Sequence, residues 1–328
     1  MNKWTPTMPR VLAVLGVFLA ISALLLVVDQ TLLKPYLSLG SQYRRLALMD
    51  ASLVLLIPLF IWSSMITRRK RLPAFKGGPR WLTWASVLLV FALALSLRVF
   101  LTLQNTLLRE KIPVIYLVLL VILVAEGFSP TSFGLTTNKV LRNVLLGVFL
   151  FVVFAMPTTL GLTALMTGSN PFHGFDLAYL ALSLPFQLFG VALAEEALFR
   201  GYLQTKLETQ IKAWGAILLQ AVLFGAWHFV RWVRPLRLEP MAFHVVTSLL
   251  FGVVLGAYYR RTRNLIAPIV LHALFNSVLA SAGLSAWRLG RTGPMYQSLG
   301  GLAALVLAAL VVALAGRISR LFGARPAV

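Results

Sequence analysis

Long apolar runs, separated by short polar or basic segments, follow one another along almost the whole chain. Most of these runs are close to the roughly 20 residues that a helix needs to cross the hydrocarbon core of a bilayer. The pattern therefore predicts an all-α fold, a polytopic transmembrane helical bundle of about ten spans. The predicted spans cover residues 11–28, 46–66, 81–103, 113–128, 140–166, 176–199, 213–230, 241–259, 264–283 and 298–316.

The composition agrees with a membrane protein and suggests an orientation. The chain is 59% hydrophobic and only 12% charged, which is more apolar surface than a soluble domain needs. Its net charge of +21 comes largely from Lys and Arg in the short segments between apolar runs. That distribution is typical of positive-inside topology and argues against a nucleic-acid partner. Placing both termini in the cytoplasm (N-in, C-in) puts most of the 30 Lys and Arg residues inside.

Two further features narrow the chemistry and the location. The chain has no cysteine, which excludes disulfides, thiol nucleophiles and thiolate metal sites. The first apolar run continues into Asp29 without a small-residue cleavage site, so we expect it to stay in the protein as an anchor. We predict a multi-pass integral membrane protein whose partner is the lipid bilayer, in the plasma membrane if the source is prokaryotic.

Two adjacent carboxylates, Glu195 and Glu196, interrupt the sixth apolar run of a chain that has only nine acidic residues. An ionisable residue inside a membrane span is costly and indicates function. Glu196 and Arg200 are four residues apart, so on a helix they share a face and can form an ion pair. Glu195 is turned about 100° from Glu196 around the helix. We expect this helix to continue past Arg200 to about Glu208.

Two later apolar runs carry polar residues at helical spacing. Phe224 and His228 are four residues apart on one run, and His272 and Asn276 are four residues apart on another. In contact with lipid their polar atoms would be unsatisfied, so we expect these side chains to face the interior or a wet cavity. Counting along the predicted helices allows them to lie at depths similar to that of Glu195. The spacing therefore predicts one shared site.

These residue types are sufficient for hydrolysis of a peptide bond. A glutamate desolvated among apolar helices is suited to act as a general base toward water. The two histidines can hold a divalent metal or orient water, and Asn276 can donate to a developing oxyanion. The chain has no H-E-x-x-H, no G-x-S-x-G and no cysteine nucleophile, and the sequence from Gly283 to Ser285 is only a weak serine-protease resemblance. Taken singly, each polar residue is explained at least as well as a polar contact between helices, and His228 is explained better in that way.

Four other polar residues are given no catalytic role. Arg98, near the outer end of the third span, is predicted to snorkel toward the interface. Glu126, followed by Gly127, is expected at a membrane interface. His173 and His244 lie near the ends of spans and are predicted to be non-catalytic.

Three motifs in order, E-E-x-x-x-R, F-x-x-x-H and H-x-x-x-N, resemble those of the CPBP family of intramembrane proteases. This family includes the type II prenyl-CAAX endoprotease and proteins linked to bacteriocin immunity. The resemblance covers about residues 175–283 and extends to F-R-G-Y-L after the Glu pair and N-L-I-A-P before His272. It implies an intramembrane endopeptidase that acts on a membrane-associated protein or peptide. A non-catalytic immunity or scaffolding protein of the same fold is the alternative.

The resemblance also implies roles for the site residues. Glu195 would activate water with His228 and His272 in the site, Asn276 would face the oxyanion, Phe224 would pack the site, and two residues would give support, Glu196 and Arg200. If a metal is bound, Zn²⁺ or another divalent ion would take His228, His272 and Glu195 as ligands. Hydrolysis by glutamate-activated water alone stays open. The predicted organisation is accessory helices over 1–135, a protease core over 136–284, and a last helix with a basic tail over 285–328.

Overall fold

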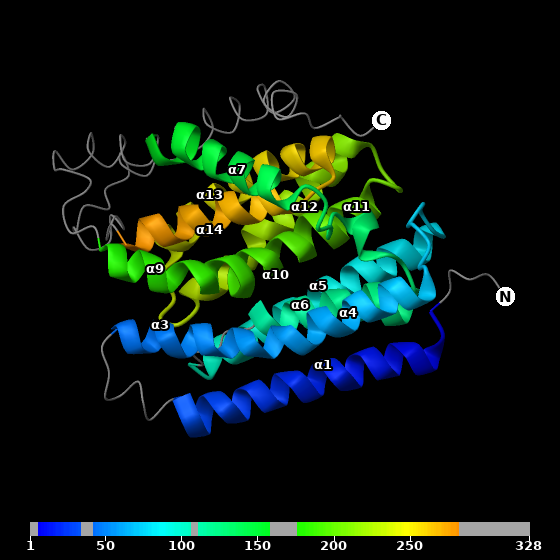
Figure 1. Cartoon of the computed structure of the whole chain (residues 1–328), viewed down its shortest axis with the longest axis horizontal. Coiled ribbons are helices and arrows are strands. Elements are labelled where there is room, and N and C mark those ends of the chain that lie inside the picture. The colour runs from blue at the N-terminus through cyan, green and yellow to red at the C-terminus, as the bar shows by residue number, and fades with distance from the viewer. Residues whose placement is uncertain (1–5, 34–41, 106–110, 158–175, 282–328) are drawn as a thin grey trace. The chain divides into compact units, whose positions relative to one another are not determined.

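The computed structural model describes residues 6–33, 42–105, 111–157 and 176–281. This part of the chain is helical and contains no strand; one isolated bridge pairs Val233 with Leu236. The helices form two compact units, and Figure 1 colours them by residue number. Unit 1 comprises Met1–Thr136 and Phe189–Ala216, and unit 2 comprises Thr137–Leu188 and Ile217–Val328. The predicted division into accessory helices, core and tail follows the sequence motifs and stays a prediction.

Unit 1 is built around one helix that is buried on nearly all sides. Nine of the ten residues of helix α6 (Lys111–Leu120) are buried, as expected for a mainly apolar helix enclosed by other helices. It packs against several helices of the unit. These are α1 (Met8–Val28), α4 (Leu56–Lys70), α5 (Arg80–Leu103) and α10 (Leu193–Glu196). A shorter helix, α3 (Gln42–Ala51), precedes α4 through a 3-10 turn over Ser52–Leu55.

Unit 2 joins its helices through close backbone approaches. Its helices are α7 (Val140–Leu150), α9 (Leu177–Pro185), the part of α12 (Ala213–Trp227) from residue 217 onward, α13 (Leu238–Thr262) and α14 (Ile266–Ser281). Helix α14 packs on α7 and α9. At Gly147 on α7, an added Cβ would lie 2.8 Å from the carbonyl oxygen of Ala267 on α14. A glycine therefore sets how closely these two helices can pack.

The helix with the Glu pair is long and unusual in its winding. It runs without a break from Leu177 to Leu207, which confirms that it continues past Arg200 almost to Glu208. Two stretches wind as π-helix, Phe186–Ala192 and Ala197–Gln204, and α10 with the Glu pair lies between them. A last turn, α11 (Thr205–Leu207), closes the helix. π-helical turns inside α-helices are frequent at functional sites.

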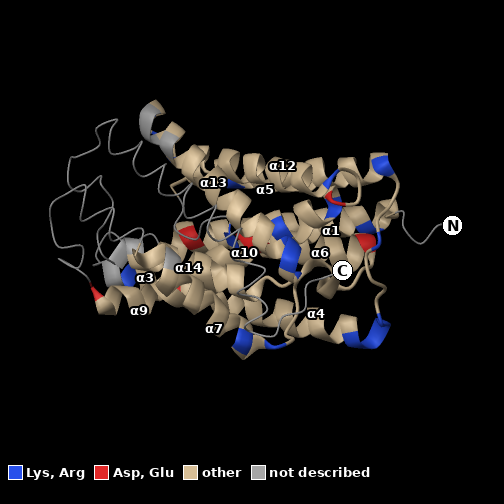
Figure 2. Ribbon diagram, turned by 90° about the horizontal axis from the view of Figure 1, so that it is seen from above, with Lys and Arg blue, Asp and Glu red and all other residues tan. Residues whose placement is uncertain are grey.

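Apolar helices occupy the predicted spans that lie among the described residues. Five of them are long and apolar enough to cross a membrane, namely Met8–Leu32, Arg44–Lys70, Arg80–Leu103, Leu177–Leu207 and Ala213–Trp232. Large apolar side chains on α1 such as Leu12 and Leu19 are about 60% exposed, as lipid-facing side chains should be. Lys and Arg lie at helix ends such as that of α4 (Figure 2). The predicted span 298–316 lies outside the described residues.

Candidate active site

The Glu pair is fully enclosed in unit 1. Glu195 is 2% exposed and Glu196 and Arg200 are completely buried. The Arg200 guanidinium donates from Nη1 to Glu196 Oε1 over 2.9 Å. The spacing of four residues predicted this pair, and the structure confirms it. A buried carboxylate needs a compensating charge, and Arg200 supplies one for Glu196. The ion pair also stabilises the helical turn that carries Glu195.

Two cations from other helices reach Glu195. Lys111, the first residue of α6, donates from Nζ to Glu195 Oε1. Arg98 on α5 places Nη1 3.5 Å from the same oxygen. Both cations are themselves buried, at 5% and 7% exposure. Glu195 is therefore held in an ion-pair cluster in which two cations compensate its charge.

The prediction that Arg98 snorkels toward the interface is wrong. Its side chain stays buried because the ion pair with Glu195 offers a compensating charge inside the unit. Lys111 was missed because it stands just before the predicted fourth span, whereas α6 begins at this residue. For Arg98 the sequence did hold a usable signal. Charges are scarce inside apolar runs, so a basic residue within a predicted span should have an acidic partner.

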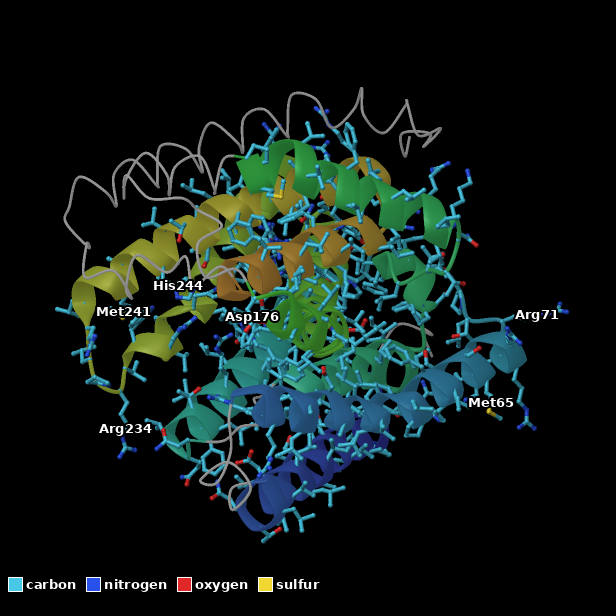
Figure 3. All side chains as sticks on the ribbon, turned by 60° about the vertical axis from the view of Figure 1, so that its left-hand side comes forward. Met65, Arg71, Asp176, Arg234, Met241 and His244 are labelled. Carbon is cyan, nitrogen blue, oxygen red and sulfur yellow. The ribbon has the colours of Figure 1, made fainter. Side chains whose placement is uncertain are left out.

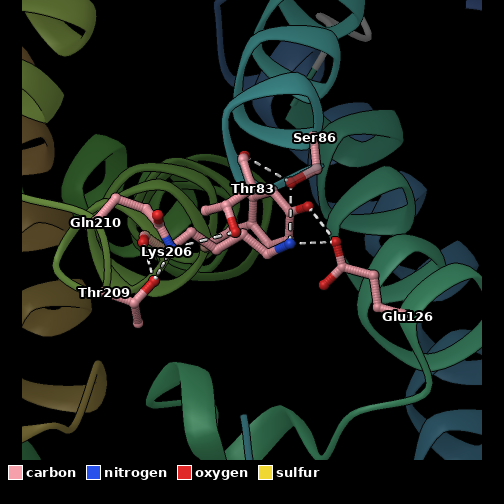
Figure 4. A network of polar contacts seen from close by, with 7 residues as sticks. Thr83, Ser86, Glu126, Lys206, Thr209 and Gln210 are labelled. Carbon is pink, nitrogen blue, oxygen red and sulfur yellow. Dashed lines mark hydrogen bonds and ion pairs between the residues drawn. The ribbon is translucent and has the colours of Figure 1, made fainter. Parts of the chain in front are cut away.

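A second polar network holds the far end of the Glu-pair helix (Figure 4). Lys206 donates to Glu126 Oε1 and, over 2.9 Å, to Ser86 Oγ. The hydroxyl of Tyr202 donates to the same Glu126 oxygen over 2.7 Å. The sequence analysis predicted an interfacial position for Glu126 and no partner; in the structure Glu126 has two buried partners on one helix. Through Ser86 the network also ties that helix to α5.

In unit 2, two of the predicted histidines meet around one phenylalanine. The ring of Phe224 on α12 lies 4.7 Å from that of His228 and 6.2 Å from that of His272, each edge to face. His272 on α14 is 3% exposed and also meets Phe251, at 5.5 Å. His228 Nδ1 lies 2.7 Å from the carbonyl oxygen of Phe224. Because that oxygen can only accept, Nδ1 carries the proton and Nε2 has the lone pair of the neutral ring.

Asn276 has a partner that the sequence did not reveal. Its amide Nδ2 donates to Gln187 Oε1 over 3.1 Å, which joins α14 to the first π-helical stretch of the Glu-pair helix within unit 2. An amide nitrogen carries two hydrogens, so this bond uses one and fixes the direction of the other. The sequence analysis did not predict a role for Gln187, because a single glutamine in an apolar run forms no motif with its neighbours.

His244 contacts the predicted site although its sequence position suggested no role. Its ring lies 4.9 Å from that of His228, and its Nδ1 accepts from Trp232 Nε1 over 3.0 Å. The prediction that His244 takes no part in catalysis is neither supported nor opposed by these contacts. His173 lies outside the described residues.

The contacts described above lie within one unit or the other and do not test the predicted shared site. Glu195, Glu196 and Arg200 belong to unit 1, while His228, His272 and Asn276 belong to unit 2. Within either unit, the described His, Asp and Glu residues form no group of three that could hold a metal. A metal with Glu195, His228 and His272 as ligands would need both units, so metal binding stays a prediction.

Apolar helices that are long enough to span a bilayer, with buried ion pairs inside them, define a multi-pass integral membrane protein. Residues 177–278 match the family Type II CAAX prenyl endopeptidase Rce1-like. The match covers about a third of the chain and agrees with the resemblance to the CPBP motifs. The matched segment contains the Glu pair, both site histidines and Asn276. Searches of curated proteins and of solved structures found no match.

Proposed function

We propose that the protein is an intramembrane endopeptidase that hydrolyses a peptide bond of a membrane-associated protein or peptide. The observation that carries the proposal is Glu195, a carboxylate at 2% exposure inside the segment that matches the endopeptidase family. Burial of such a charge is costly in a membrane helix. Two cations from helices outside the matched segment, Arg98 and Lys111, compensate its charge. Three buried charged side chains are therefore gathered at this one position.

In the proposed reaction Glu195 acts as general base. It takes a proton from water while the water oxygen bonds to the carbonyl carbon of the substrate. It then passes that proton to the amide nitrogen as the carbon–nitrogen bond breaks. His228 presents the lone pair of Nε2 to the water, because its Nδ1–H is held by the Phe224 carbonyl. Asn276, directed by Gln187, donates to the developing oxyanion. Glu196 and Arg200 hold the turn rigid.

A divalent metal is an optional part of this proposal. Imidazole nitrogens and a carboxylate are suitable ligands for Zn²⁺, and the hydrogen bond of His228 Nδ1 to a backbone oxygen is typical of metal-binding histidines. His228, His272 and Glu195 would hold the ion. When bound, it would act as a Lewis acid toward the water.

We further propose the finer topology suggested by the sequence. It has about ten spans with both termini in the cytoplasm, in a plasma membrane if the source is prokaryotic. Cysteine-accessibility labelling can test it directly, because the chain has no cysteine of its own. Single cysteines at exposed positions such as Lys70 and Lys212 should react only with a reagent that reaches the cytoplasmic side.

The experiment that tests the activity is a comparison of new peptide termini in membranes containing the wild-type protein or Glu195→Gln. Cleavage should disappear in Glu195→Gln although the variant inserts and folds. Glu208→Gln is the matched control, since Glu208 lies beyond the end of the same helix and is only half-buried. A parallel arm with a chelator, followed by Zn²⁺, tests the metal: activity that survives chelation assigns the reaction to glutamate and water alone.

The same comparison decides against the alternative. A non-catalytic immunity or scaffolding protein would leave identical termini in wild-type, Glu195→Gln and Glu208→Gln membranes while its cellular phenotype persists in all three. That result would refute the endopeptidase proposal.

A further inference from the structure

We propose that His244 and Trp232 are positioning residues that fix the ring orientation and the tautomer of His228. This inference deepens the proposed function and rests on it for its catalytic meaning. The three side chains come from neighbouring elements of unit 2. His228 follows α12, Trp232 ends the 3-10 turn Phe229–Trp232, and His244 lies in the second turn of α13. Figure 3 labels His244 on that helix.

The hydrogen bonds assign the protons of both rings. The indole N–H of Trp232 can only donate, so His244 Nδ1, at 3.0 Å, must carry a lone pair. The neutral ring of His244 then has its proton on Nε2. His228 has the opposite tautomer, because its Nδ1 lies 2.7 Å from the carbonyl oxygen of Phe224, which can only accept. In the neutral ring of His228 the lone pair is therefore on Nε2, the nitrogen that faces the water in the proposed reaction.

Two rings pack against His228 and limit its rotation. Phe224 meets it edge to face at 4.7 Å, with an interplanar angle of 70°. His244 meets it at 4.9 Å and 63°. His228 itself is only half-buried, so burial alone does not hold its ring. The ring of His244 in turn lies 6.1 Å from that of Trp232, almost perpendicular to it.

The role of Trp232 follows from this geometry. Its N–H holds the ring of His244 in one of its two flipped orientations, since a flip would replace the acceptor Nδ1 by a carbon. With its ring held by this hydrogen bond, His244 packs against His228 in a single orientation. Loss of either residue should let the His228 ring turn and lose its bond to the Phe224 carbonyl. The ring would then take the Nε2–H tautomer, which neutral imidazole favours in water and whose lone pair lies on Nδ1, on the wrong side of the ring for the proposed reaction.

Nitrogen NMR of the full-length protein, labelled with ¹⁵N only at histidine, tests the inference without any substrate. The chain has four histidines, and single substitutions assign their signals. The wild-type spectrum should show His228 with its proton on Nδ1. Trp232→Phe keeps a ring but lacks the donor, and His244→Asn keeps an acceptor but lacks the ring. Each should move the His228 signals toward the other tautomer or a mixture.

Two controls isolate the effect from general unfolding. The signals of His272 should stay unchanged in both variants, since His272 lies on α14 and its ring packs against those of Phe224 and Phe251. Trp214→Phe is the matched tryptophan variant, because Trp214 is 52% exposed. On a cleaved substrate, kcat should fall roughly ten- to hundred-fold in Trp232→Phe and His244→Asn, with KM nearly constant.

The possible outcomes separate this inference from the proposed function. His228 signals that are the same in wild type, Trp232→Phe and His244→Asn would overturn the positioning role, whatever the activity. A shift of His228 in both variants, with cleavage missing even from the wild-type protein, would support the positioning of the ring and refute the endopeptidase. A shift together with a fall in kcat supports both.

Discussion

The ion pair between Lys206 and Glu126 fixes the end of the helix that carries the Glu pair, and its removal should destabilise unit 1. Lys206 is 4% exposed and Glu126 is 8% exposed. The described hydrogen bonds of the Glu126 carboxylate fall on Oε1, where Lys206 and Tyr202 both donate. Oε2 has no partner among the described residues. The substitution Lys206→Met would leave this carboxylate with the Tyr202 hydroxyl alone.

The size of the effect follows from which charge is left behind. Removing one partner of a buried ion pair typically costs about 3–5 kcal/mol, because the other charge stays buried and uncompensated. Tyr202→Phe removes one hydrogen bond to a charged acceptor, for which about 1.5–3 kcal/mol is expected. Removing both charges, in Lys206→Met with Glu126→Gln, should cost less than Lys206→Met alone, since no unpaired charge remains.

Reversible unfolding in mixed micelles, followed by tryptophan fluorescence, measures these free energies. Lys212→Met is the matched control, because Lys212 is exposed just beyond the end of the same helix. We expect the order of destabilisation Lys206→Met, then Tyr202→Phe, with the control unchanged. The reasoning fails if Lys206→Met costs no more than Lys212→Met, or if the double substitution is as destabilising as Lys206→Met.

Two further predictions concern unit 2. Gly147→Ala should weaken the packing of α7 on α14 and lower thermal stability in detergent, because its Cβ would lie 2.8 Å from the Ala267 carbonyl oxygen; Gly16→Ala, where nothing lies within 4 Å of the new Cβ, should not. Equal melting temperatures would contradict the close packing. Gln187→Leu removes the acceptor of the Asn276 amide and should lower kcat on a cleaved substrate with little change in KM. An unchanged kcat would rule out this bond as a guide for Asn276.

Much of the secondary structure and part of the site could be predicted from local pattern. Hydrophobic runs predict apolar helices because their length and composition are fixed by the residues themselves. The ion pair of Glu196 with Arg200 is local too, since a spacing of four residues brings the side chains together on any helix. The continuation of that helix past Arg200 follows from the same periodicity.

The partners supplied by other helices could not be predicted in this way. Arg98 and Glu195 are far apart in the chain, and so are Asn276 and Gln187. Which distant helices lie together depends on packing, which hydrophobic periodicity does not encode. Arg98 was predicted to snorkel because only its position on its own helix, near the interface, was considered. Its partner Glu195 lies on another helix. His244 was set aside for the same reason, whereas a bend after α12 brings it against His228.

The contacts of Glu195 give the helices before the matched segment a role in the site. The family match begins at residue 177, yet both cations bound to Glu195 come from α5 and α6, which precede it. Arg200, the nearest cation in the motif itself, bonds Glu196 instead. Since an uncompensated carboxylate is costly at this degree of burial, the matched segment of this chain depends on the preceding helices for charge compensation. Arg98 and Lys111 are therefore as much a part of the Glu195 site as the motif residues.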